Sequence, residues 1–166
     1  MGTSSPTYVQ HSNPSPDSGE DEARLLLIGR IGDQPFIVPL SAVERVLPMA
    51  APATVPGAPQ GVVGVLHVFG SLLPVVDPHQ RLGFPTPRFH PDQRLILVHA
   101  GTRYLLWMDT VVRIVAAQAL PERQTGTPDT LVPYVAQVDG ESIPVLSPWA
   151  LDPGFVVAGE VVTTWS

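Results

Sequence analysis

Three features are missing from this chain of 166 residues: cysteine, lysine and long uninterrupted apolar runs. Without cysteine the protein has no disulfides, no thiolate nucleophiles and no cysteine-based zinc sites. All nine cationic side chains are arginine, so the chain has neither a Schiff-base lysine nor the lysine of a GxxxxGK[ST] phosphate loop. The fold must therefore be held by its apolar core, and two large classes of enzyme are excluded.

The apolar stretches are too short to cross a membrane. A spanning helix needs about 18 or more uninterrupted apolar residues, and even residues 61–76 are broken by glycines, His67, Ser71 and Pro74. Residues 1–22 combine proline, serine, threonine and acids without the apolar core of a signal peptide. We therefore expect residues 1–22 to be a disordered acidic tail, and we expect a cytoplasmic protein without direct membrane insertion.

The charge of the chain is acidic and unevenly distributed. The formal net charge is −6, and four negative charges fall within residues 17–22, so the remainder carries about −2. A nucleic-acid-binding protein would need a basic stripe, which the sequence does not provide. No nucleic-acid partner is therefore expected. Since 44% of the residues are hydrophobic, the chain has enough apolar surface for one or two small cores.

Short apolar runs separated by turn residues predict a mainly β protein. The chain contains 20 prolines and 14 glycines and no long amphipathic helical pattern. Asp139-Gly140 is the strongest turn signal, and Phe69-Gly70 places a large apolar ring at a turn. The four predicted hairpins are 25–31 with 36–40, 62–68 with 72–76, 94–99 with 104–108, and 134–138 with 143–146.

The residues that follow these hairpins suggest an internal repeat. Each hairpin is followed by a residue that can cap a short helical turn: Ser41, Asp77, Asp109 or Ser147. Pro78 and Pro148 fit first helical positions, Glu44 completes a capping box with Ser41, and Gly83 fits the end of a turn. The sequence offset from Ser41 to Asp109 nearly equals that from Asp77 to Ser147. This pattern predicts two related β units joined near 84–92, packed together with a groove between them. The alternative is chance recurrence of common turn chemistry.

Candidates for catalysis are few. Asp77 and Asp109 each follow two apolar residues, as in an aspartic protease, but neither is followed by the glycine that lets the chain turn behind a catalytic acid. Helix capping explains both residues better. The five histidines have no metal-ligand spacing and are expected to be exposed or at strand ends, and Ser71 is not in a GxSxG elbow. We therefore predict that the chain is not an enzyme and uses no cofactor or metal.

An ordered set of motifs runs over residues 25–151. Residues 43–46 (VERV), which we take as a turn, resemble V-x-E-I, and residues 64–70 (GVLHVFG) resemble G-V-x-N-L-R-G. Residues 72–78 (LLPVVDP) followed by RLG resemble I-L-P-V-I-D-L with R-L-G, and residues 108–111 resemble V-D-x-V. In this order the motifs resemble those of the CheW family of chemotaxis adaptors. The chain departs from the pattern at Phe69, where the family commonly has arginine, and at Ser147, where the family commonly has aspartate.

The resemblance implies two small, roughly five-stranded β-barrel subdomains with short helical turns between strands, in a domain over 23–157. Residues 155–165 are read as one or two further short strands, and 158–166 as a C-terminal extension that closes a barrel. The resemblance also implies a non-catalytic adaptor whose partners are the regulatory domain of a CheA-like histidine kinase and the cytoplasmic tip of a chemoreceptor. The alternative is a divergent protein-binding module outside the flagellar array, serving pilus motility or other signalling.

The partner-binding residues that this resemblance and the exposed turn suggest lie in three segments of the chain. Phe69 can either contact a partner or pack onto the neighbouring barrel, and Val43 and Val46 can either line the groove or belong to the core. The full set of candidates is Val43, Arg45, Val46, Gly64, His67, Phe69, Gly70 and Asp109.

Overall fold

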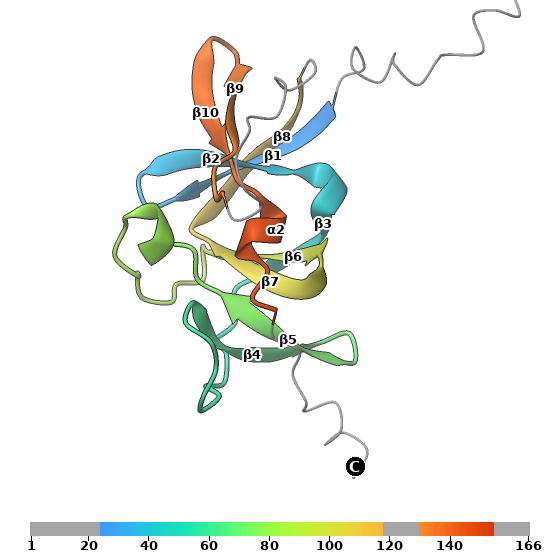
Figure 1. Ribbon diagram of the computed structural model, residues 1–166, viewed down its shortest axis with the longest axis vertical. Helices are drawn as coiled ribbons and strands as arrows, with labels where there is room; N and C mark the ends of the chain where they lie inside the picture. Colours follow the sequence, from blue (N-terminus) through green and yellow to red (C-terminus); the bar gives the residue numbers. More distant parts are fainter. Residues whose placement is uncertain (1–23, 118–129, 155–166) are drawn as a thin grey trace, which may run out of the picture.

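The computed structural model describes residues 24–117 and 130–154 (Figure 1). The predicted acidic tail, the C-terminal extension and the strands predicted over 155–165 lie outside these residues. Within the described part of the chain, no helix has the length and apolar character needed to cross a membrane.

The described residues form ten strands and three short helical turns. The first half of the chain contains β1 (Arg24–Ile31), β2 (Gln34–Pro39), η2 (Leu40–Ala42), β3 (Val43–Pro48), β4 (Val62–Val68), β5 (Ser71–Val76) and η3 (Gln80–Leu82). The second half contains β6 (Arg94–Ala100), β7 (Thr102–Met108), β8 (Thr110–Ala117), β9 (Tyr134–Val138), β10 (Glu141–Val145) and α2 (Pro148–Leu151). The mainly β class and all four predicted hairpins are confirmed.

The strands form two five-stranded sheets. Sheet A has the order β8-β1-β2-β10-β9, and sheet B has the order β3-β6-β7-β5-β4. Most neighbouring strands are antiparallel, but β10 runs parallel to β2 and β5 runs parallel to β7. Among the described residues no backbone ladder joins the two edge strands of either sheet, so closure into barrels is not confirmed.

The two sheets are copies of one strand order, related by an internal repeat. Replacing β1–β5 by β6–β10, and the reverse, converts the order of sheet A into that of sheet B. The first strand begins at Arg24 in one repeat and at Arg94 in the other, and the two-residue turns begin at Phe69 and Asp139. The separation in sequence is the same for both pairs and agrees with the offsets of the predicted caps. The topology therefore supports duplication over chance recurrence.

The prediction that each repeat forms its own subdomain, divided near 84–92, is wrong. Sheet A combines β1 and β2 of the first repeat with β8, β9 and β10 of the second, whereas sheet B combines β3, β4 and β5 with β6 and β7. The exchange is made by β3, which pairs with β6, and by β8, which pairs with β1. The sequence pattern predicts a turn over 43–46 and a helical turn after Asp109, but the two exchanged strands lie at these places.

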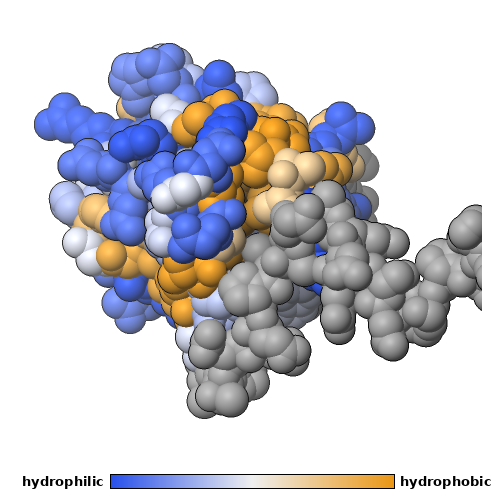
Figure 2. Space-filling model, turned by 90° about the horizontal axis from the view of Figure 1, so that it is seen from above, coloured by the Kyte–Doolittle hydropathy of each residue, from blue (hydrophilic) through white to orange (hydrophobic). Residues whose placement is uncertain are grey.

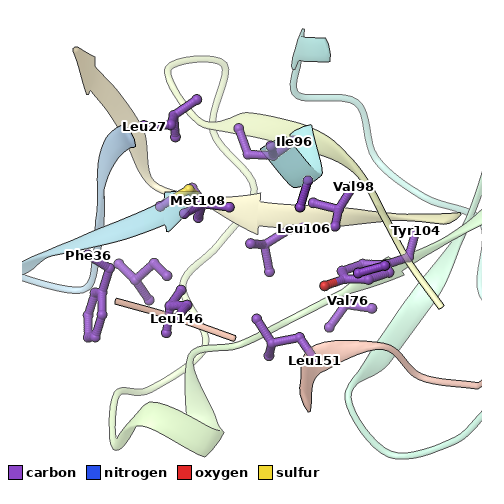
Figure 3. Close-up of a cluster of buried hydrophobic side chains, with 14 residues drawn as sticks. Leu27, Phe36, Val76, Ile96, Val98, Tyr104, Leu106, Met108, Leu146 and Leu151 are labelled. Atoms are coloured by element: carbon purple, nitrogen blue, oxygen red, sulfur yellow. The ribbon is translucent and has the colours of Figure 1, made fainter. Parts of the chain in front are cut away.

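The predicted groove between the units is occupied by a packed core (Figure 3). Side chains alternate along the central strands, so Ile96 and Val98 of β6 face this inter-sheet core while Leu95 and Leu97 face the interior of sheet B. A smaller cluster, including Leu26 and Ile28 of β1, fills the interior of sheet A. The labelled side chains of the inter-sheet core include Leu27, Phe36, Val76, Ile96, Val98, Tyr104, Leu106, Met108, Leu146 and Leu151 (Figure 3).

The predicted helix cap is confirmed at Ser147, confirmed in part at Asp77 and revised at Ser41 and Asp109. The Asp77 side chain accepts a hydrogen bond from the backbone N–H of His79 at 2.8 Å. The Ser147 side chain accepts a hydrogen bond from the backbone N–H of Ala150 at 3.2 Å, with Pro148 at the start of α2. Gly83 ends η3 in the left-handed conformation, but η3 begins only at Gln80. The turn η2 has no side-chain cap, so the capping box at Ser41 is wrong, and Asp109 is followed directly by β8.

Candidate partner-binding surface

The tip of the β4–β5 hairpin carries an exposed aromatic ring on a strained backbone. Phe69 and Gly70 form a two-residue turn with φ values of 48° and 84°, which is the sign pattern of a type I′ turn. The left-handed conformation costs a non-glycine residue about 1–2 kcal/mol, and phenylalanine lacks the local hydrogen bonding that makes asparagine or aspartate tolerable there. The ring of Phe69 is nevertheless 66% exposed, so burial in the chain's own core does not offset this cost.

Arg45 lies against the ring of Phe69. Its guanidinium carbon is 4.7 Å from the ring centroid, within the range of a cation–π interaction. Arg45 belongs to β3, where the pairing with β6 skips Glu44, so a bulge precedes the arginine. Bulges redirect side chains at sheet edges. Two of the predicted residues, which come from separate segments of the chain, are thus brought together.

Three more predicted residues lie at the surface near these two in the sequence. Val46 follows Arg45 on β3 and is 40% exposed, which is high for a valine in a strand. His67 on β4 and Gly70 at the hairpin tip are also exposed. Arg45, Val46, His67, Phe69 and Gly70 are called the tip surface below.

The remaining three predicted residues point inward or are enclosed. Val43 packs against the inter-sheet core. Gly64 is buried, and a Cβ there would lie 2.5 Å from the carbonyl oxygen of Ala53, so this position allows the connection after β3 to cross β4 closely. Asp109 is half-buried and bonded within the chain. Gly64 is therefore buried and has no side chain, and Val43 and Asp109 are half-buried.

A buried polar network that the sequence pattern does not predict is centred on His79. This histidine is 0% exposed, in contrast to the expectation for the histidines. Its Nδ1 lies 2.6 Å from Asp77 Oδ1, and its Nε2 lies 3.2 Å from Asp109 Oδ1. Thr86 donates a hydrogen bond to Asp77, and the backbone N–H of Gly32 donates one to Asp109 at 2.6 Å. The network therefore joins sheet B to the β1–β2 turn of sheet A.

The environment of this network favours a protonated histidine between two carboxylates. Burial by itself would lower the pKa of His79, but the hydrogen bond and charge of Asp77, together with Asp109, outweigh burial and raise that pKa. Burial would likewise raise the pKa of Asp77, but the hydrogen bonds from His79 and Thr86 lower it overall. Both ring nitrogens of His79 are adjacent to carboxylates, which suits an imidazolium that donates twice.

This arrangement cannot act as a catalytic triad. A general-base histidine needs a free nitrogen facing a nucleophile, whereas both nitrogens of His79 face carboxylates and the ring is buried. The nearby hydroxyl of Thr86 donates to Asp77 and not to His79. Over residues 24–117 and 130–154, no group of three or more His, Cys, Asp or Glu side chains is arranged to hold a metal ion.

Apolar side chains are also exposed away from the tip surface. On sheet A, Leu25 is 53% exposed and Ile114 is 53% exposed. Figure 2 views the molecule from the sheet A end and shows apolar surface between hydrophilic residues. In the connection before β6, Phe89 is 47% exposed and its ring centroid is 4.8 Å from that of Trp107 on β7. Phe89 also lines a hollow of about 230 Å³ with Met49.

Comparisons with known proteins agree on one family. The family model described as "CheW-like domain" matches residues 25–152. The Chemotaxis protein CheW of Rhizobium meliloti is 40% identical over 80 residues, and a Probable chemotaxis protein CheW of Rhizobium etli is 31% identical over 80 residues. Each of these matches covers 48% of this chain and 50% of the relative, so the chain spans about half the length of the curated relatives it matches.

The fold has a solved counterpart. The crystal structure of scaffolding protein TtCheW from Thermoanaerobacter tengcongensis superimposes with a TM-score of 0.64 at 20% sequence identity, and the match covers 75% of this chain and 89% of that one. The relatives are named as chemotaxis and scaffolding proteins, in agreement with the prediction that this chain is not an enzyme. Because the family model matches most of the sequence, the chain belongs to the CheW-like domain family.

Proposed function

We propose that this chain is a non-catalytic adaptor in bacterial chemosensory signalling, linking the cytoplasmic tips of chemoreceptors to the regulatory domain of a CheA-type histidine kinase. Membership of the CheW-like family supports this role. In this proposal the protein works in the cytoplasm, at the receptor array. In this proposal each sheet also curls as a small barrel. The contact between Arg45 and Phe69 supports this for sheet B, and the contact between Arg113 and Asp139 supports it for sheet A.

The observation that carries the proposal is the tip surface. Phe69 is held in a strained turn and is exposed, although nothing in the packing of residues 24–117 and 130–154 requires a large ring there. Strained residues that the fold does not need are found at functional sites, and exposed aromatic and arginine side chains are common anchors of protein interfaces. We assign the partner contacts to Arg45, Val46, His67, Phe69 and Gly70. Val43, Gly64 and Asp109 have contacts within the fold that account for them.

A second candidate function is a protein-binding module outside the flagellar array, serving pilus motility or another pathway. The observation that favours it is Phe69, since the resembling motif commonly has arginine at this position. A partner that recognises an arginine side chain at position 69 itself would find an aromatic ring there instead.

The test is binding of the purified chain to two fragments from the same organism, the regulatory domain of the CheA-type kinase and the cytoplasmic hairpin of a chemoreceptor. We expect both to be captured, separately and as a ternary complex, because an adaptor must hold both at once. Capture of neither fragment, with the chain folded by circular dichroism, would overturn the adaptor role.

A further inference from the structure

We propose that Arg45 and Phe69 form a composite anchor that recognises a carboxylate lying next to an apolar side chain on a protein partner. This inference rests on the proposed function and adds the chemistry of the partner's surface. It is drawn from the internal repeat, which supplies a second copy of the same local structure within the molecule.

The second copy is the contact between Arg113 and Asp139. In the repeat, Arg113 corresponds to Arg45 and Asp139 corresponds to Phe69, at nearly the same sequence offset. Asp139 and Gly140 have φ values of 52° and 81°, almost those of Phe69 and Gly70. In both copies an arginine of an edge strand, β8 or β3, contacts the first residue of a hairpin turn.

The two copies differ in how the arginine is neutralised. Arg113 Nη2 lies 3.2 Å from Asp139 Oδ2, so its charge is paired within the chain. Arg45 has an aromatic ring in place of that carboxylate, and among the described residues no acidic side chain pairs with it. Its neighbour Glu44 is 3.0 Å from Arg103 and 3.4 Å from His99. The charge of Arg45 is therefore available to a partner.

The ring orients this charge without neutralising it. A guanidinium held over an aromatic face keeps the N–H groups at its edge free to donate, and these groups match the two oxygens of a carboxylate. The 66% exposed ring offers apolar surface beside them. An acidic side chain flanked by an apolar one complements both halves of the anchor, whereas a basic partner surface would be repelled by Arg45.

The turn residue supplies the second argument. Aspartate is well suited to a positive φ, and the repeat has it at position 139. Phenylalanine at position 69 adopts the same backbone conformation at an energetic cost and leaves its ring in solvent. An aspartate at position 69 would therefore suit the turn better than phenylalanine does, which points to a role for the ring outside the fold.

The test is the substitution Phe69→Asp, which converts the tip of sheet B into the tip of sheet A. An aspartate suits the turn and can pair with Arg45 as Asp139 pairs with Arg113, so the urea midpoint should be unchanged or higher. Binding to the kinase regulatory domain or to the receptor hairpin should weaken at least tenfold, since the ring is lost and Arg45 becomes neutralised. Asp139→Asn, at the other tip, is the matched control and should leave both affinities within twofold.

The carboxylate on the partner is tested with Arg45→Gln and with salt. Affinity of the wild-type chain for the affected fragment should fall between about 50 and 300 mM NaCl, as expected for a screened ion pair. Arg45→Gln should bind less tightly at low salt and lose most of this salt dependence. If the wild-type chain binds and Phe69→Asp binds both fragments equally well, or if Arg45→Gln keeps the full salt dependence, the anchor is wrong while the adaptor role stands.

Discussion

The two places where parallel strands end side by side have equivalent positions in the repeat and different chemistry. In sheet B, β5 and β7 are followed directly by Asp77 and Asp109, and His79 joins the two carboxylates. In sheet A, β10 and β2 lead to Ser147 and Ser41, where Ser147 caps α2 locally. We refer to these as the charged joint and the neutral joint.

The comparison shows that two copies of one backbone can be stabilised by different side-chain interactions. The neutral joint uses a side chain that bonds three residues along the chain, whereas Asp109 of the charged joint bonds Gly32, 77 residues away. A local cap stabilises one helical turn. The charged joint connects the two sheets through residues distant in sequence, and it contains the titratable side chains of His79 and Asp77.

The largest effect is expected from His79→Ala. Removing the imidazolium leaves the carboxylates of Asp77 and Asp109 facing each other in a largely buried site, and breaking a buried pair costs about 3–5 kcal/mol. Urea unfolding at neutral pH measures the loss. His99→Ala, which removes an exposed histidine beside Glu44, is the control and should change the free energy of unfolding by less than about 0.5 kcal/mol. Equal effects of the two substitutions would contradict the importance of the charged joint.

The pH dependence of stability should be of intermediate size. Because the pKa of His79 is raised from 6.5, its contribution is complete below that value and is lost as the pH rises through the raised pKa. Because the pKa of Asp77 is lowered from 3.8, its contribution is present above 3.8 and is lost as the pH falls through the lowered pKa. Urea unfolding should therefore show higher stability at about pH 5.5 than at about pH 9.

The control for this profile is His79→Ala, which should not show the alkaline decrease. An alkaline decrease that is as large in the variant as in the wild-type chain would assign the effect to another group.

The smallest effect is expected at the neutral joint. Ser147→Ala removes one hydrogen bond to the backbone N–H of Ala150 and should cost about 1 kcal/mol. The loss should be the same at every pH, because no titrating group contacts this serine hydroxyl among the described residues. Ser147→Asp should restore the cap and most of the stability. A pH-dependent loss in Ser147→Ala would break the contrast between the joints.

Local signals were sufficient for the hairpins and for the repeat. Alternating or continuous apolar runs around Gly32, Gly70, Gly101 and Gly140 identified four strand pairs, because hairpin contacts are close in sequence. Strands β3 and β8 were missed because their partners, β6 and β1, belong to the other repeat and lie far along the chain. Side chains such as Glu44 and Arg113 made these segments look like turns or solvated loops.

Only part of the candidate site can be predicted from the sequence, because some of its contacts join residues that are far apart along the chain. Phe69 is recognisable from sequence because a large ring at a two-residue turn has few neighbours to bury it. The contact with Arg45 depends on the exchange that places β3 in sheet B. His79 follows Asp77 by two residues, a spacing that alone indicates a turn, and its second carboxylate comes from a strand whose parallel pairing has no local signal.

The sequence by itself determined the β class, the hairpins, the internal repeat and the absence of cysteine and lysine chemistry, because these depend on composition and on neighbours along the chain. The tertiary structure decided which repeat supplies each strand, and with it the charged joint and the pairing of Arg45 with Phe69. Those features join residues distant in sequence, and the apolar core between the sheets holds the strands in the positions that bring them together.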